Sequence, residues 1–154
     1  MLQALAVGLA IVIVPGVAQA GTISYQAGSE HQVLALLNQI RQQKGLSSLA
    51  LSTSLRGAAR SHTADMLRGT YFGHSSSSGT LISRSPKGAF SGETIAWGVG
   101  SSGSPAALVG QWMRSTSHRA VILSPGIRRV GIGIALGTFG TTRNAVMATA
   151  GFAS

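Results

Sequence analysis

Three residues that lie far apart in the sequence carry side chains suited to chemistry: His74, Glu93 and His118. Two imidazoles and a carboxylate form a known donor set for an open zinc site. The same residue types suit acid–base catalysis, with His74 or His118 as general base and Glu93 orienting it. Their separation matches no local metal or catalytic motif, so the fold must bring them together.

The acidic residues are scarce, because the chain contains only three: Glu30, Asp65 and Glu93. Glu30 and Asp65 lie in segments predicted to be helical, and we expect both at helix surfaces. Glu93 instead lies in an apolar stretch between Phe90 and Ile95. A carboxylate is costly to bury there unless another group pairs with it, so we expect Glu93 to have a partner.

His31, His62 and the serines are weaker candidates for a functional role than His74 and His118. His31 falls in the first turn of a predicted helix and is expected to be solvated. His62 lies on an apolar helical stripe, where a hydrogen-bonded core histidine is favoured over a ligand. His118 is expected at the start of a short helix, whose positive end favours neutral imidazole. In a hydrolase, Ser75 or Ser117 could be the nucleophile, but no nucleophile-elbow motif singles out either serine.

The chain has 154 residues, of which 12 are Lys or Arg, and a net charge of +9. Such a surface attracts anionic material, namely envelope polymers or acidic lipid headgroups. Nucleic acid is an unlikely partner, because the aromatic residues are scattered rather than clustered with basic ones. The absence of cysteine excludes disulfides and thiolate metal sites.

The first twenty residues are typical of a signal peptide. An apolar run precedes the small-x-small site formed by Ala18 and Ala20, and it is too short to favour a spanning helix. No Lys or Arg precedes the run, which leaves an uncleaved anchor or a misassigned start as alternatives. We therefore predict a secreted or envelope-associated protein with a leader over 1–20, a lead over 21–29 and one domain over 30–154. An exported chain without cysteine favours a bacterial source.

The elements that must position the site are helices first and strands last. This order, without βαβ repeats, predicts an α+β domain in which helices cover an antiparallel sheet. Small residues at Gly131 and Gly133 should let a helix approach the sheet closely. The first predicted helix begins at a capping box with Ser29 as N-cap and ends at Gly45, and the second covers 55–69. The third begins at Ser104-Pro105, and the fourth covers 118–123 with Ser117 as its cap. The predicted strands cover 90–99, 130–136 and 144–152; a turn is predicted over 137–143, and a turn or short helix over 81–88.

These motifs together resemble a bacterial member of the CAP superfamily, named for cysteine-rich secretory proteins, antigen five and pathogenesis-related proteins. The resemblance extends over about residues 30–152, and its specificity comes from the order and spacing of the motifs. The motifs are Leu36-Leu37-Asn38-Gln39-Ile40-Arg41 with Lys44-Gly45-Leu46, Leu55 through His62 to Asp65-Met66, Tyr71-Phe72-Gly73-His74, Gly92-Glu93-Thr94-Ile95-Ala96, Trp112-Met113-Arg114-Ser115 through His118-Arg119, and Val130-Gly131-Ile132-Gly133.

The resemblance implies an α-β-α sandwich with an antiparallel central sheet and a large cleft. In that cleft His74 and His118 take the roles of the histidines that can bind zinc or another divalent cation, and Glu93 takes one acidic role. The chain departs from the family pattern at Thr94, where an Asn is usual. Ser-Thr-Ser replaces Ser-Pro-Gly at 115–117, and no second acidic residue follows Trp112.

Two functions stay open at this point. The first is a secreted binding module whose His74–Glu93–His118 cleft takes a divalent metal, a small molecule or a lipid. The second is an extracellular, peptidase-like hydrolase that uses the same three residues as its catalytic group. We prefer binding, on analogy with the fold.

Overall fold

The computed structural model describes residues 21–76, 79–80 and 90–154. The helices are α1 (Ala27–Gln43), α2 (Thr53–Gly69), α4 (Pro105–Arg114) and α5 (Thr116–Ile122), with a short 3-10 helix η1 (Gly100–Gly103). The strands are β1 (Ser24–Tyr25), β2 (Ala50–Leu51), β3 (Ser75–Ser76), β4 (Gly79–Thr80), β5 (Phe90–Val99), β6 (Arg129–Phe139) and β7 (Thr142–Ala153).

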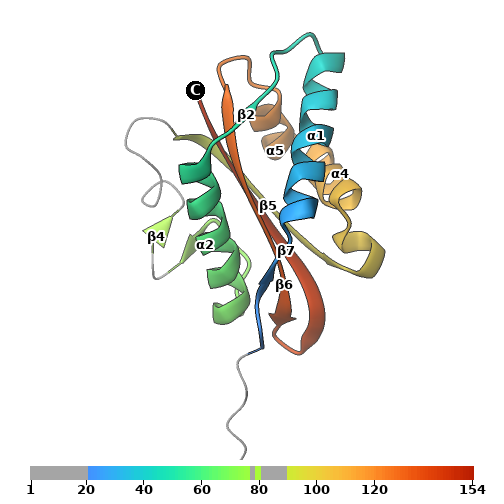
Figure 1. The fold of residues 1–154 in the computed structure, drawn as a ribbon, viewed down its shortest axis with the longest axis vertical. Coiled ribbons are helices and arrows are strands. Elements are labelled where there is room, and N and C mark those ends of the chain that lie inside the picture. The colour runs from blue at the N-terminus through green and yellow to red at the C-terminus, as the bar shows by residue number, and fades with distance from the viewer. Residues whose placement is uncertain (1–20, 77–78, 81–89) are drawn as a thin grey trace, which may run out of the picture.

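The central sheet has the order β1-β6-β7-β5, and β2 joins β6 as a parallel neighbour. The long strands β5, β6 and β7 are antiparallel. Figure 1 shows α2 on one side of these strands and α1, α4 and α5 on the other. The predicted α+β class and the α-β-α sandwich are therefore confirmed.

Where α2 crosses β6, the strand presents small residues to the helix. A Cβ added at Gly131 would collide with the backbone of Leu55 and Arg56, and one at Gly133 with Ala59 and Arg60. The side chain of Thr63 reaches the same strands, since its Oγ1 lies 3.0 Å from the Gly133 carbonyl oxygen. The predicted close approach of a helix to this strand is confirmed.

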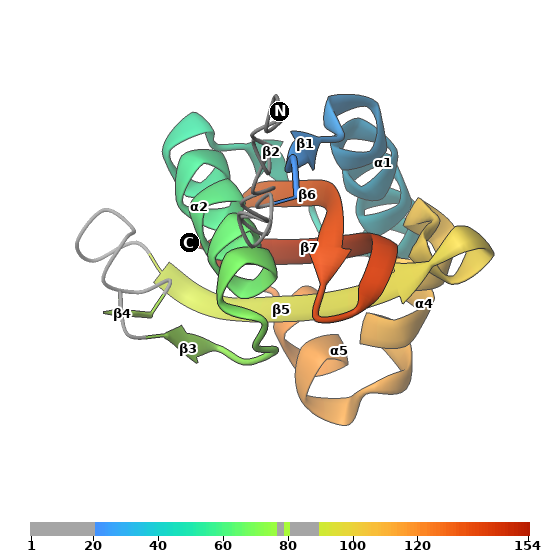
Figure 2. The ribbon, with the colours of Figure 1, turned by 90° about the horizontal axis from the view of Figure 1, so that it is seen from below.

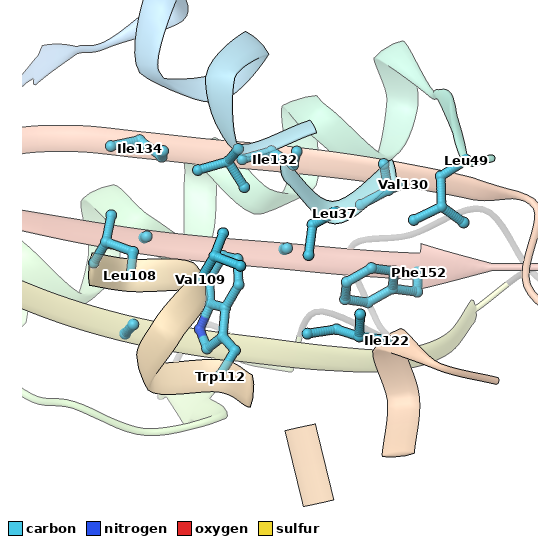
Figure 3. Close-up of a cluster of buried hydrophobic side chains, with 14 of the residues drawn as sticks. Leu37, Leu49, Leu108, Val109, Trp112, Ile122, Val130, Ile132, Ile134 and Phe152 are labelled. Atoms are coloured by element: carbon cyan, nitrogen blue, oxygen red, sulfur yellow. The ribbon is translucent and has the colours of Figure 1, made fainter. Parts of the chain in front are cut away.

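The opposite face of the sheet carries the larger hydrophobic core, shown in Figure 3. Trp112 of α4, Ile122 of α5 and Leu37 of α1 pack there with no more than a trace of exposure. They meet Ile132 and Phe152 from the central strands. One core therefore fixes three helices against the sheet, including α5, which carries His118.

Two predicted helix starts are wrong. Helix α1 begins at Ala27 with Gln26 as N-cap, so Ser29 is inside the helix, and the N–H of Glu30 donates to the Gln26 carbonyl. Helix α5 is capped by Ser115, not Ser117, because the Ser115 hydroxyl accepts from the His118 N–H. Ser115 accepts through its side chain as an N-cap does, whereas Gln26 makes no side-chain cap hydrogen bond. The start of α4, with Ser104 as N-cap, is as predicted.

Strand β5 covers the predicted range. Strands β3 and β4, which the sequence did not predict, pair with each other. The turn predicted over 137–143 is tighter, since Phe139 already pairs with Thr142. The predicted leader over 1–20 and the predicted turn or short helix over 81–88 lie outside the described residues.

A fully buried arginine, Arg41, connects the end of α1 to the segment that follows α5. Arg41 donates hydrogen bonds to the carbonyl oxygens of Ser47, Ile122, Ser124 and Ile127. Burial, with the nearby charge of Arg128, lowers the pKa of this guanidinium, yet an arginine stays protonated at neutral pH. Four carbonyl dipoles therefore hold one buried cation and join the end of α1 to the segment between α5 and β6.

Candidate functional site

The three predicted site residues meet at the β5 edge of the sheet. In Figure 2, β5 is the outermost of the three long strands, and β3 and α5 lie beyond it. His74 precedes β3, Glu93 lies in β5 and His118 lies in α5. His74 Nδ1 lies 2.6 Å from Glu93 Oε1, and the rings of His74 and His118 are 5.8 Å apart between centroids.

The end of α2 directs His74 toward this edge. Thr70 caps the helix in the left-handed conformation, with φ of 51°, which a β-branched residue adopts only under local constraint. Gly69 is the last residue of the helix, as predicted. A Cβ at Gly69 would lie 2.9 Å from the ring of Tyr71, so the glycine makes room for that ring.

The hydrogen bond to Glu93 fixes how His74 presents its ring. A carboxylate oxygen accepts, so His74 Nδ1 donates the proton in this 2.6 Å contact. In neutral His74 the lone pair therefore lies on Nε2. The side chain of His74 is 55% exposed and that of Glu93 is 6% exposed, so a buried carboxylate orients an accessible imidazole.

The imidazole of His118 favours its neutral form. Burial lowers the pKa of His118, and the nearby charge of His74 lowers it further. The direction agrees with the sequence-based expectation, although burial rather than the helix end is the leading cause. His118 can therefore offer a nitrogen lone pair near neutral pH.

The sequence pattern missed the proximity of His62 to Glu93. His62 is fully buried and lies 3.0 Å from the Gly73 carbonyl oxygen through Nε2, which confirms the predicted hydrogen-bonded core histidine. The same Nε2 is 3.8 Å from Glu93 Oε1. A side chain that points from a helix across to a neighbouring strand leaves no periodic signal in the sequence. His31, by contrast, is exposed as expected.

The prediction that Glu30 lies at the surface is wrong. Its side chain is 2% exposed and lies 2.8 Å from both Arg56 and Arg60, while the Ile134 N–H also donates to it. Burial raises the pKa of Glu30, but the hydrogen bonds from Arg60, Ile134 and Arg56 outweigh burial and leave the pKa below its usual value. Glu30 is thus a second buried carboxylate, away from the predicted site.

The separation of the two imidazole rings equals that of two histidines on one divalent cation. Two histidines that share one tetrahedral zinc at about 2.0–2.1 Å have ring centroids roughly 5–6 Å apart, and the observed separation is 5.8 Å. Within the described ranges, no group of three or more His, Asp or Glu side chains is arranged to hold a metal. The donors at hand are therefore His74 Nε2 and His118, with Glu93 behind His74 as its orienting partner.

A separate apolar groove of about 480 Å³ lies between α1 and α4. Ala35 and Leu36 line it from α1, and Pro105 and Ala106 line it from the start of α4. None of the three predicted site residues lines this groove. The ligand cleft that the resemblance implies at His74, Glu93 and His118 stays a prediction.

Comparison with known proteins identifies the family to which this architecture belongs. The model of the family described as CAP, the cysteine-rich secretory protein family, matches residues 34–149. The chain belongs to this family. The residues that the CAP resemblance was built on, from Leu36 to Gly133, all lie inside the matched range.

Related proteins share this CAP domain within longer chains. The sequence is 34% identical to the uncharacterized membrane protein YlbC of Bacillus subtilis over 71% of this chain, and 34% identical to the uncharacterized protein YkwD of the same bacterium over 68% of it. These matches cover 32% of YlbC and 41% of YkwD, so the chain spans less than half of either relative.

Solved structures agree with the fold. An extracellular protein containing an SCP domain from Bacillus anthracis has a TM-score of 0.65 and 25% identity, over 83% of this chain and 41% of that one. An outer surface protein of Borrelia burgdorferi has a TM-score of 0.70 at 16% identity, over 87% of this chain and 98% of that one. In the described part of the CAP domain, no helix has the length and apolar content needed to span a bilayer.

Proposed function

We propose that this CAP domain is an exported binding module whose His74–Glu93–His118 cluster takes a divalent cation. The observation that carries the proposal is the 2.6 Å contact from His74 Nδ1 to Glu93 Oε1. This contact leaves Nε2 as the ligand atom of a ring that lies 5.8 Å from the ring of His118. A carboxylate behind a metal-binding histidine is the usual arrangement of such ligands.

His74 and His118 would hold the cation, and Glu93 would fix the orientation and basicity of His74. A bound divalent cation supplies positive charge and open coordination positions for an oxygen-bearing ligand. Glu93 is the carboxylate that contacts His74, and no acidic residue stands at the family's second acidic position after Trp112. We therefore expect an open site that is weaker than a four-ligand structural zinc site.

Calorimetry with zinc tests the proposal directly. The chain from Gly21 onward contains every described helix and strand, so it is compared with its His74→Ala/His118→Ala double variant. Zinc should bind the parent and lose affinity strongly in the double variant. Equal affinity in the two proteins would show that the zinc binds elsewhere.

The hydrolase alternative uses the same cluster. The Glu93–His74 pair resembles a carboxylate that orients a general base. However, Ser117 Oγ lies 3.1 Å from Ser115 Oγ, so its described partner is another hydroxyl rather than an imidazole. A panel of peptides and esters separates the two functions, because turnover that disappears in the double variant would replace the binding-only proposal.

The proposed association of the domain with the cell envelope is based on its positive charge. The net charge is +9, and exposed basic side chains lie on several elements of the described domain, namely Lys44, Arg68, Arg114, Arg119, Arg128, Arg129 and Arg143. Retention on cell envelopes should fall steeply between low and high salt, because salt screens exposed charges. Retention that does not depend on salt would exclude charge as the cause.

The lipid or small-molecule alternative is best matched by the groove between α1 and α4, because its lining is apolar. Ala35→Trp would fill this groove without touching the histidines. If the groove binds acyl chains, the variant should lose binding of a fluorescent fatty acid and keep its zinc affinity. Unchanged fatty-acid binding would exclude the groove.

A further inference from the structure

His62 is a buried imidazole placed directly behind the surface cluster. It lies on α2 with no exposed surface, whereas the side chain of His74 is more than half exposed. A buried polar side chain is costly unless its hydrogen bonds are satisfied, so the groups around His62 determine why an imidazole is tolerated there. Two of those groups, Gly73 and Tyr71, belong to the segment that leads into His74.

One nitrogen of His62 faces two of the groups that determine where His74 lies. Nε2 is 3.0 Å from the Gly73 carbonyl oxygen, in the peptide unit that joins Gly73 to His74. The same Nε2 is 3.8 Å from Glu93 Oε1, the oxygen that accepts from His74 Nδ1. The backbone before His74 and the side-chain partner of His74 therefore share one buried neighbour.

The tautomer of His62 follows from these contacts. A carbonyl oxygen accepts only, so His62 Nε2 carries a proton and donates it to Gly73. The hydroxyl of Tyr71 lies 3.5 Å from His62 Nδ1, on the same segment after α2. The ring thus links a packed helix to Tyr71 and Gly73, the residues that lead into His74.

We propose that His62 is a positioning residue for His74, which it holds through its hydrogen bond to the Gly73 carbonyl. Its contribution to metal affinity rests on the proposed zinc function, whereas its contribution to the orientation of His74 does not. An aliphatic side chain at position 62 would fill the space but could not donate to Gly73. A side chain with an amide at the reach of Nε2 would restore the donor.

Three substitutions of His62 separate positioning from simple packing. His62→Leu keeps apolar volume and removes the donor. His62→Gln places an amide nitrogen near the position of Nε2, while His62→Asn buries the same amide one bond short of it. Thr63→Val is the matched control, because it removes another buried side-chain donor from the next residue of α2, one that faces Gly133 and Thr149 instead.

The first readout is zinc affinity, measured by calorimetry on the chain from Gly21 onward. His62→Leu and His62→Asn should weaken zinc binding by about 10- to 100-fold, the usual range for a lost outer-shell contact. His62→Gln should stay within about threefold of the parent, given the restored donor. Thr63→Val should leave affinity unchanged. Parent-like affinity in both His62→Leu and His62→Asn would overturn the proposal.

The second readout is the tautomer of His74, measured from its imidazole nitrogen shifts by NMR without metal. The parent and His62→Gln should show the Nδ1–H form that the contact with Glu93 requires, and His62→Asn should lose that preference. If the parent binds no zinc, the proposed function fails and this readout still decides the role of His62. An unchanged His74 tautomer in His62→Asn would overturn the proposal. If His62→Leu does not fold, the comparison of His62→Asn with His62→Gln still tests the role of His62.

Discussion

The domain contains two buried carboxylates that are held by the same helix in different ways. Glu30 is 2% exposed and is paired with Arg56 and Arg60 of α2. Glu93 is 6% exposed and lies near His62 of the same helix, while it binds His74. Helix α2 therefore places guanidiniums against one carboxylate and an imidazole against the other.

The difference between these partners is the basis on which we assign different roles to the two carboxylates. The guanidiniums around Glu30 are always charged, and with the Ile134 N–H they satisfy both of its oxygens. The imidazole that Glu93 orients reaches solvent, because the His74 side chain is 55% exposed. We infer that the Glu30 cluster stabilises the fold and that the Glu93 cluster prepares a ligand atom.

The largest effect should come from Glu30→Gln. Removing one partner of a buried ion pair costs about 3–5 kcal/mol, and the low end applies here because Arg56 and Arg60 are about one-quarter exposed. Urea unfolding should show a loss of about 3 kcal/mol in the free energy of unfolding. Zinc affinity should be unchanged. If Glu30→Gln lowers the free energy of unfolding no more than Glu93→Gln does, the two carboxylates do not differ in their structural role.

Glu93→Gln should have the opposite profile. We expect zinc affinity to fall by about 10- to 100-fold, because the amide orients His74 less well than the carboxylate does. The free energy of unfolding should fall by only about 1 kcal/mol, the value of one ordinary hydrogen bond. If both calorimetry and urea unfolding match the parent, Glu93 neither orients His74 nor serves as a buried partner.

Acid should weaken the Glu30 cluster in a defined pH window. The pKa of Glu30 is lower in the folded protein, so its contribution is complete above the unfolded pKa of about 4.3 and is lost as pH falls through the folded pKa. The stability gap between the parent and Glu30→Gln should therefore be constant from pH 7 to about 5 and narrow below about 4. A gap that widens in acid would contradict the ion-pair interpretation.

The smallest effect concerns Thr94, the neighbour of Glu93. Within the described residues its hydroxyl is fully buried and has no hydrogen-bond partner. Thr94→Val removes that hydroxyl without changing the shape, so the free energy of unfolding should rise by up to about 1 kcal/mol. Thr149→Val is the control, because the Thr149 hydroxyl is bonded to Thr63 and its loss should destabilise instead. Destabilisation by Thr94→Val would indicate that the hydroxyl is satisfied.

Local pattern predicted much of the fold. Alternation identified β5, Ser104-Pro105 identified the start of α4, and the small residues Gly131 and Gly133 identified the strand beneath a helix. These features depend on neighbours in sequence, which is why they can be predicted. The start of α5 was not fixed because several polar residues could cap it, and the start of α1 has no side-chain cap for a sequence pattern to identify.

Contacts between elements were harder to predict. The residue types singled out His74, Glu93 and His118, and the family resemblance paired them. The burial of Glu30 was missed because its partners lie 26 and 30 residues away on another helix. The position of His62 beside Glu93 was missed for the same reason, since it depends on how α2 is rotated above β5.

Arg41 gives this domain a long-range tie that does not depend on redox conditions. Its contacts with Ile122, Ser124 and Ile127 connect segments 81 to 86 residues apart. The chain contains no cysteine, so a cation held by carbonyl oxygens connects distant segments here, as disulfides do in many extracellular domains. Thiol reductants and oxidants should leave this tie intact, and it can form without an oxidising folding catalyst.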